Sequence, residues 1–114
     1  MDRLVILLSR AEEIILLAVY KRRGSAYGVT IREQIFQDLG RFWSFGVIYR
    51  TLKKMTNKGY LSKYASDPIS ERGGRSRYYY EITDKGLCEL EEIQAVQSSV
   101  WDGVSKIALG KKTE

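Results

Sequence analysis

The sequence predicts a mainly α-helical fold that carries one small β-hairpin. Three segments with helical hydrophobic spacing follow one another between residues 9 and 59. Two short tyrosine-rich segments come next, separated by a loop with one proline and two adjacent glycines, which is the pattern of a hairpin. The rest of the chain repeats hydrophobic residues in steps of three and four, which predicts one long final helix.

The composition is that of a small globular protein. The 114 residues are 44% hydrophobic and 29% charged, which suits a single modest core. The longest wholly apolar run, Ile14–Tyr20, has seven residues, whereas a membrane span needs about 20. The one cysteine, Cys88, has no partner for an internal disulfide and is expected to be inert packing. We therefore expect a cytoplasmic protein that does not act at a membrane.

Several residue types and motifs that enzymes use are absent. The chain has no histidine, which is the commonest general base and metal ligand, and a lone cysteine cannot build an ordinary zinc site. It has no Walker-type loop and no G-x-G-x-x-G motif. Three glutamates could be arranged as a carboxylate metal site, but a solvated acidic helix face is the favoured interpretation: Glu89, Glu91 and Glu92. We expect no metal, no cofactor and no enzymatic activity.

Positive charge is concentrated in the middle of the sequence. The whole chain carries +5, but residues 41–77 hold nine cations and two acids, or nine minus two, +7. The remaining residues hold ten cations and twelve acids, or −2. Because apolar residues interrupt the basic segment at regular intervals, it belongs to folded elements with one free face. This distribution predicts a surface that binds a polyanion.

The first helix is expected to begin at the capping box Ser9–Glu12, in which side chains satisfy the first free backbone donors. It should end near Lys21 or Arg22, before Gly24. Its unbroken apolar run through Tyr20 predicts burial on most sides, which in so small a domain points to a partner subunit.

The second helix is expected to start near Ala26–Gly28 and to continue to about Leu39, where Gly40 ends it. Ile31, Ile35 and Leu39 recur every four residues and mark its inner face.

The third helix is expected to run from the N-cap Ser44 to Lys58, with Gly59 as its end. Its inner stripe consists of four apolar residues: Phe45, Ile48, Leu52 and Met55. Its outer face contains no acid and comprises Gly46, Arg50, Lys53, Lys54 and Asn57, with Val47 at the margin. Since a solvated helix face usually mixes both signs of charge, this face is expected to lie in a nucleic-acid groove.

The hairpin is expected to consist of a strand from Tyr60 to about Ser66, a loop, and a returning strand at Arg77–Ile82. Alternation along the returning strand predicts that Tyr78, Tyr80 and Ile82 face the core, while Tyr79 and Glu81 face outward. The arm carries a pair of glycines among arginines: Arg72, Gly73, Gly74, Arg75 and Arg77.

The final helix is expected to start at Thr83 or Asp84 and to reach about Leu109, although Gly103 weakens its last turns. Its heptad positions form a seam: Leu90, Ile93, Gln97, Val100, Val104 and Ile107. About 26 residues at 1.5 Å each would be ~39 Å long, more than a small domain can cover. A second copy of the same helix is the expected partner of this seam.

Three segments of the chain carry ordered motifs: SAYGVTIREQI, SFGVIYRTLKKMTNKGYL and SERGGRSRYYYEITDKG. Together they resemble the PadR family of bacterial transcriptional regulators. The family's Tyr-Gly, Gly-x-x-Tyr-x-x-Leu, Gly-Gly-Arg and Thr-x-x-Gly motifs are matched by Tyr27-Gly28, Gly46 to Leu52, Gly73 to Arg75, and Thr83 to Gly86. The resemblance covers about residues 9–90, and a single C-terminal helix is typical of the family's short branch. Arg50 departs from it, because the family often has proline there.

The resemblance implies a winged helix-turn-helix domain at residues 1–82 and a dimerisation helix and tail at 83–114. It implies a homodimer that binds double-stranded, near-palindromic operators and most often represses transcription, with helix 44–58 in the major groove and wing 67–77 at the minor groove. The resulting DNA-binding candidates are Tyr27, Ser44, Gly46, Val47, Arg50, Lys53, Lys54, Arg72, Gly73, Gly74, Arg75 and Arg77. For Tyr27, packing and phosphate contact both stay open.

Trp101 lies beside the predicted seam and has two candidate roles. It can pack between two subunits, or, as in some short members of the family that the chain resembles, it can line a pocket for a flat hydrophobic effector. Trp43 is expected to be core or to position the third helix. The main alternative function is a winged-helix module that binds another protein and no DNA. The acid-free cationic face and the arginines of the wing argue against that alternative.

Overall fold

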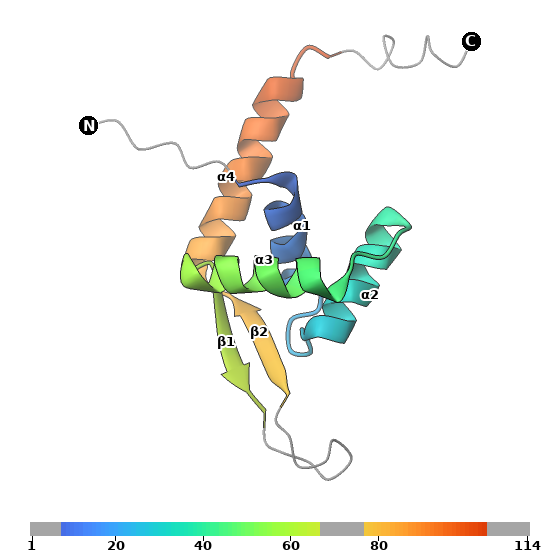
Figure 1. Cartoon of the computed structure of the whole chain (residues 1–114). Coiled ribbons are helices and arrows are strands. Elements are labelled where there is room, and N and C mark those ends of the chain that lie inside the picture. The colour runs from blue at the N-terminus through green and yellow to red at the C-terminus, as the bar shows by residue number, and fades with distance from the viewer. Residues whose placement is uncertain (1–7, 67–76, 105–114) are drawn as a thin grey trace.

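The structure is a computed structural model that describes residues 8–66 and 77–104. Within these residues the chain forms helices α1 (Arg10–Lys21), α2 (Gly28–Leu39) and α3 (Phe45–Asn57), strands β1 (Leu61–Ala65) and β2 (Tyr78–Ile82), and helix α4 (Asp84–Trp101). The hairpin projects to one side of the first three helices, and α4 extends to the opposite side (Figure 1). This order of elements confirms the predicted mainly α-helical fold with one small hairpin.

The core forms where α1, α2 and α3 pack against one another. Each helix contributes side chains with no exposed surface: Ile15, Leu16 and Val19 from α1, Ile31 and Ile35 from α2, and Ile48, Leu52 and Met55 from α3. The hydrophobic spacing of α2 and α3 therefore predicted their inner faces correctly, except at one end of each helix. Leu39 ends α2 and Phe45 begins α3, and both are exposed. Phe45 meets α2 at its surface, where the Arg32 guanidinium lies 4.6 Å from its ring centre.

The expected start of α1 is confirmed in atomic detail. The Glu12 backbone N–H donates to Ser9 Oγ at 3.1 Å, and the Ser9 N–H donates to Glu12 Oε1 at 2.8 Å, which completes the capping box. Most of the apolar run of α1 is buried as expected, at Ile15, Leu16, Ala18 and Val19, while Leu17 and Tyr20 remain exposed. Helices α2, α3 and α4 and strand β2 all pack against α1.

The hairpin is antiparallel, with Lys63 opposite Tyr80 and Ala65 opposite Tyr78. Tyr80 is buried, and its backbone N–H donates to the Ala26 carbonyl at 2.8 Å, which ties β2 to the segment before α2. Tyr78 was expected to face the core but is exposed, because its position on β2 extends past the helices. The Lys63 ammonium lies 4.3 Å from the centre of its ring instead.

Helix α4 begins as predicted, with Thr83 as N-cap and its Oγ1 accepting from the Gly86 N–H at 3.1 Å. It ends at Trp101 after 18 residues, not near Leu109 as expected. The backbone leaves the helix at Asp102, and Gly103 takes a left-handed conformation with φ +82°. Glycine adopts this conformation without steric penalty, which favours an end to the helix here.

The side chains of α4 differ from two other expectations. Cys88 was expected to be packed but is exposed. Glu89 was expected to belong to a solvated face but is buried. Among residues 8–66 and 77–104, no group of three or more histidine, cysteine or acidic side chains is close enough to hold a metal ion. Over the same residues, no helix combines the length and the apolar composition that crossing a membrane requires.

Candidate nucleic-acid interface

Helix α3 presents a cationic face that its own core residues hold in place. Ser44 caps the helix, accepting a hydrogen bond from the Val47 N–H at 3.2 Å, and Ile48, Leu52 and Met55 anchor the opposite side in the core. The predicted outer-face residues are all exposed, and Val47 is half-buried at the margin: Gly46, Arg50, Lys53, Lys54 and Asn57. A rigid helix with one free basic face is a suitable shape for a DNA groove.

The two adjacent lysines of α3 point to different surroundings. Lys54 Nζ forms an ion pair with Glu12 Oε2 at 2.9 Å, and the Glu12 side chain is only 7% exposed. Lys53 lies on the hairpin side of the helix, where it lines a pocket. The charge of Lys54 is therefore paired with Glu12 of α1, while Lys53 makes no ion pair with the described residues.

The Glu12 carboxyl is the buried acid of this region. Burial by itself would raise its pKa, but hydrogen bonds from Lys54 and the Ser9 backbone, together with the charges of Lys54 and Lys58, hold that pKa below its ordinary value of 4.5. Glu12 is therefore ionised at neutral pH, and its pair with Lys54 joins the first turn of α1 to α3.

We expect Glu12→Gln to lower the free energy of unfolding at pH 7 by about 1–2 kcal/mol, because it removes a partly buried charged pair. A carboxyl whose pKa is lower in the folded state stabilises the fold above its unfolded pKa, and that contribution disappears as the pH falls through the folded pKa. Urea unfolding should therefore show a gap between variant and wild type at pH 7 that shrinks below about pH 4.5.

The matched control is Glu13→Gln, because Glu13 meets Arg10 only at 3.9 Å and that arginine is largely exposed. The control should change stability by less than about 0.5 kcal/mol. Equal losses in both variants would contradict the role given to the pair of Glu12 and Lys54.

The half of the hairpin nearer its loop carries an aromatic and cationic stack. The Arg77 guanidinium lies 4.0 Å from the centre of the Tyr27 ring, and Tyr27 also contacts Tyr79, which packs on Tyr64. Two predicted site residues far apart in the sequence, Tyr27 and Arg77, are thus in direct contact. The other wing candidates, Arg72, Gly73, Gly74 and Arg75, lie outside the described residues.

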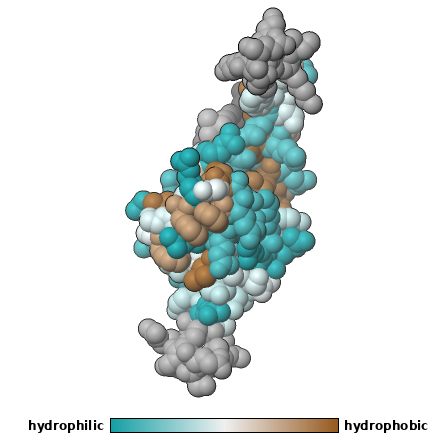
Figure 2. All heavy atoms as spheres, turned by 90° about the vertical axis from the view of Figure 1, so that its right-hand side faces the viewer, coloured by the Kyte–Doolittle hydropathy of each residue, from teal (hydrophilic) through white to brown (hydrophobic). Residues whose placement is uncertain are grey.

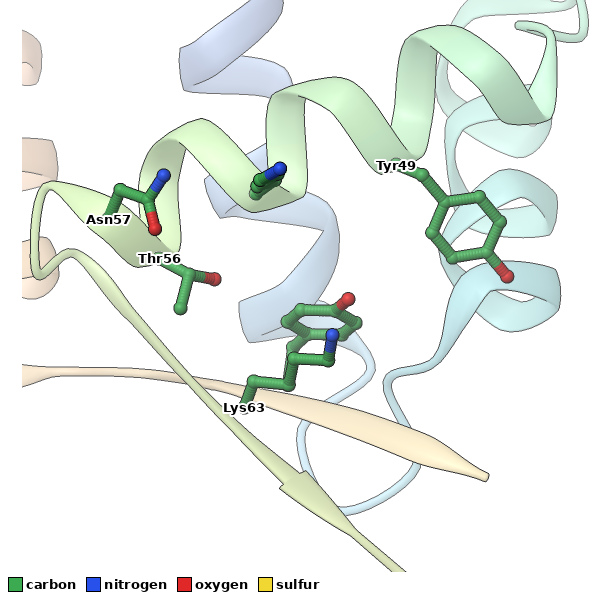
Figure 3. A pocket seen from close by; sticks show the side chains of 6 residues that line it. Tyr49, Thr56, Asn57 and Lys63 are labelled. Carbon is green, nitrogen blue, oxygen red and sulfur yellow. The ribbon is translucent and has the colours of Figure 1, made fainter. Parts of the chain in front are cut away.

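A pocket lies between α3 and the hairpin (Figure 3). Its volume is about 440 Å³, and six residues line it: Tyr49, Lys53, Thr56, Asn57, Lys63 and Tyr80. Of these, only Lys53 was among the residues predicted to bind DNA. Lys63 was counted as one of the cations of the basic segment, and Asn57 was placed on the outer face of α3, but hydrophobic spacing could not show that they converge.

The Tyr-Gly and Gly-x-x-Tyr motifs meet in the structure. The Tyr49 ring packs directly over Gly28, where any side chain would collide with its hydroxyl group. A side chain at position 28 would therefore displace the Tyr49 ring from this place. This contact gives Tyr49 a packing role at the junction of the two helices.

The expected dimer seam is only partly exposed. Leu90 packs against the core of its own chain, and Ile93 and Gln97 are half-buried. Val100 and Trp101, in the last turn of α4, are 71% and 58% exposed. Val104 follows the end of the helix, and Ile107 lies outside the described residues. The apolar surface that lacks cover in the single chain is therefore at the far end of α4.

A second apolar surface lies on α2 and the turn that follows it. Figure 2, which views the side of the molecule that carries α2, shows apolar atoms gathered among hydrophilic ones. Phe36 and Phe42 stack with ring centres 4.2 Å apart, and both are exposed. The Arg32 guanidinium lies 4.4 Å from the Phe42 ring centre and donates from Nε to the Trp43 carbonyl at 2.9 Å. The Trp43 side chain is half-buried and packs against the core, which was one of its two expected roles.

Comparison with known proteins agrees with this architecture. The model of the transcriptional regulator PadR-like family matches residues 16–92. No match is found among curated proteins. The chain is similar to the crystal structure of a PadR family transcriptional regulator from Eggerthella lenta, with 26% identity and a TM-score of 0.65 over 83% of this chain and 80% of that one.

Two further solved structures are similar over most of their length. A PadR-like transcriptional regulator from Bacillus cereus has 28% identity and a TM-score of 0.66, covering 85% of this chain and 89% of that one. A PadR family transcription regulator from Clostridium difficile has 25% identity and a TM-score of 0.60, covering 87% of this chain and 94% of that one. Because the family model spans more than half of the sequence, this chain belongs to the PadR-like family of transcriptional regulators.

Proposed function

We propose that the protein is a cytoplasmic, homodimeric regulator that binds double-stranded operator DNA and represses transcription. The exposed face of α3 is the observation that carries the proposal, because it holds cations and no acid on a helix anchored by three buried side chains. The major groove of B-DNA is about 12 Å wide and admits one α-helix. Helix α3 enters this groove, and the hairpin with its loop 67–76 approaches the neighbouring minor groove.

Residues of α3 and of the hairpin have different roles in the proposed recognition of DNA. Arg50 lies near the middle of the exposed face, where a guanidinium can read guanine O6 and N7 in a bidentate contact. Gly46 has no atom within 3.9 Å of the place where a side chain would begin, so the backbone at the start of α3 can approach the DNA closely. Lys53 and Arg77 supply phosphate contacts, which set the position of the protein on the duplex without specifying sequence.

The homodimer is proposed from α4. Its last turn leaves Val100 and Trp101 uncovered, and a second copy of the helix presents the same residues in return. Two copies place two α3 helices on one duplex, so that a near-palindromic operator matches the symmetry of the protein. Either role of Trp101, packing between subunits or contact with a flat hydrophobic effector, requires this second copy.

The proposal is tested by binding of the purified protein to the DNA upstream of its own gene, with a scrambled duplex as competitor and across a salt series. Tight binding that resists the competitor and falls steeply with salt supports an operator-binding regulator. Equal, weak binding of both duplexes would favour the alternative of a winged-helix module that binds another protein. The exposed aromatic surface of α2 is the feature that such a module would use.

We expect Lys53→Ala and Arg75→Ala each to weaken DNA binding about 10-fold and to reduce the salt slope by about 0.9, since each removes one cation from the proposed interface. Fluorescence anisotropy measures the binding, and light scattering checks that the dimer is intact. Lys21→Ala is the matched control, because Lys21 pairs with Asp38 at 3.0 Å on the far ends of α1 and α2. A variant that lost its dimer but bound DNA normally would contradict the assignment.

A further inference from the structure

The pocket between α3 and the hairpin receives one positive charge from each of its two walls. Lys53 comes from α3 and Lys63 from β1, and none of the six lining residues is acidic. Figure 3 shows Lys63 below the helix, on the strand that faces it. Two ammonium groups on opposite walls, with no carboxylate between them, favour an anionic occupant.

The neutral groups of the pocket add hydrogen-bond donors. The Asn57 side chain lines the pocket and forms no hydrogen bond with the residues that the structure describes, so its amide can be turned to donate to an occupant. Burial raises the pKa of Tyr80, so its hydroxyl group keeps its proton and can donate as well. Thr56 already donates to the Leu52 carbonyl at 2.8 Å. These donors surround the pocket from several directions, and the oxygens of a tetrahedral oxyanion can accept hydrogen bonds from them.

The two walls are held in place without a ligand. Lys63 is opposite Tyr80 in the hairpin, and its ammonium lies 4.3 Å from the centre of the Tyr78 ring. Tyr80 is bonded through its backbone to Ala26, which fixes β2 against the helical core. The donors therefore need little rearrangement before they bind an anion.

We propose that this pocket seats one phosphate of the DNA backbone, at the point where the strand passes between the two grooves. The inference rests on the proposed function. If α3 occupies the major groove and the hairpin approaches the adjacent minor groove, the strand that separates these grooves has to cross the gap between them. The pocket lies in that gap and has a cation on each side. In this proposal Lys63 and Asn57 bind the phosphate together with Lys53.

The test uses a duplex that the purified, full-length protein selects from a random pool, and a series of copies in which one phosphate at a time is replaced by an uncharged methylphosphonate. We expect one position in each half-site at which the replacement weakens wild-type binding about 10-fold. Lys63→Ala should weaken binding to the unmodified duplex and should lose most of its sensitivity to the replacement at that same position, the remainder being due to Lys53. Lys63→Arg should restore the sensitivity.

Matched variants separate the possible outcomes. Lys21→Ala removes the same charge far from the pocket and should keep the wild-type sensitivity at every phosphate. If Lys63→Ala lost affinity equally at all positions, or lost none, the seat would not exist. If Lys63→Ala bound DNA normally but lost a binding of inorganic phosphate that the wild-type protein shows, the pocket would serve a free anion, and the proposal would also be overturned.

Failure of the proposed function gives a different result. In that case the random pool yields no enriched duplex, and Arg50→Ala binds DNA no more weakly than the wild-type protein does. A duplex that is selected and depends on Arg50, yet shows no phosphate coupled to Lys63, would leave the function intact and remove only the phosphate seat.

Discussion

Gly86→Ala is expected to lower the free energy of unfolding by about 2–3 kcal/mol, although alanine is normally the better residue in a helix. Gly86 lies in the first turn of α4, where a methyl group would collide with the Tyr60 carbonyl oxygen and lie 2.7 Å from Ile82 Cγ1. The carbonyl cannot move away easily, because it accepts the Thr83 N–H at 3.0 Å. Accommodating the methyl group therefore requires the junction of hairpin and α4 to open.

Gly46→Ala is the matched control for this prediction. Gly46 also lies in the first turn of a helix, but no atom is within 3.9 Å of the added methyl group. The control should be neutral or should stabilise the protein by up to about 1 kcal/mol. Urea unfolding followed by circular dichroism measures both variants. A Gly86→Ala protein as stable as the control would show that the packing at this junction is looser than described.

Val100→Asp is expected to raise the dissociation constant of the dimer by about 100-fold or more. Val100 is 71% exposed in the single chain and stands at a heptad position of α4, so the proposed partner helix would cover it. Burying a carboxylate without a partner costs several kcal/mol, whereas leaving it in water costs nothing. The variant should therefore become monomeric at micromolar concentration, and its operator affinity should fall with it.

Ser99→Asp adds the same charge one residue earlier, at a heptad position that points away from the seam, and controls for charge near the end of α4. It should remain dimeric in sedimentation or light scattering. If Val100→Asp also remained dimeric, the seam would not be the dimer interface. The proposed two-fold arrangement of α3 helices would then need another contact.

The C-terminal end of α2 and the N-terminal end of α3 show where hydrophobic spacing stopped predicting burial. Hydrophobic spacing predicted the core residues Ile31 and Ile48 correctly, but it extended the same stripes to Leu39 and Phe45, which are exposed. Spacing gives the direction of a side chain around its own helix, and not how far the neighbouring helix extends. The same limit explains Tyr78, which alternates correctly on β2 but lies beyond the helices that would bury it.

The sequence by itself determined the order of the elements, the capping residues and the basic outer face of α3, because all of these depend on neighbours within a few residues. Only the tertiary structure decided which charges of that face are available. Lys53 and Lys54 are adjacent in sequence, yet Lys54 pairs with Glu12 of α1, whereas Lys53 lines a pocket together with Lys63 of the hairpin. These surroundings come from other elements of the fold, and the packing of those elements sets the distances to the two lysines.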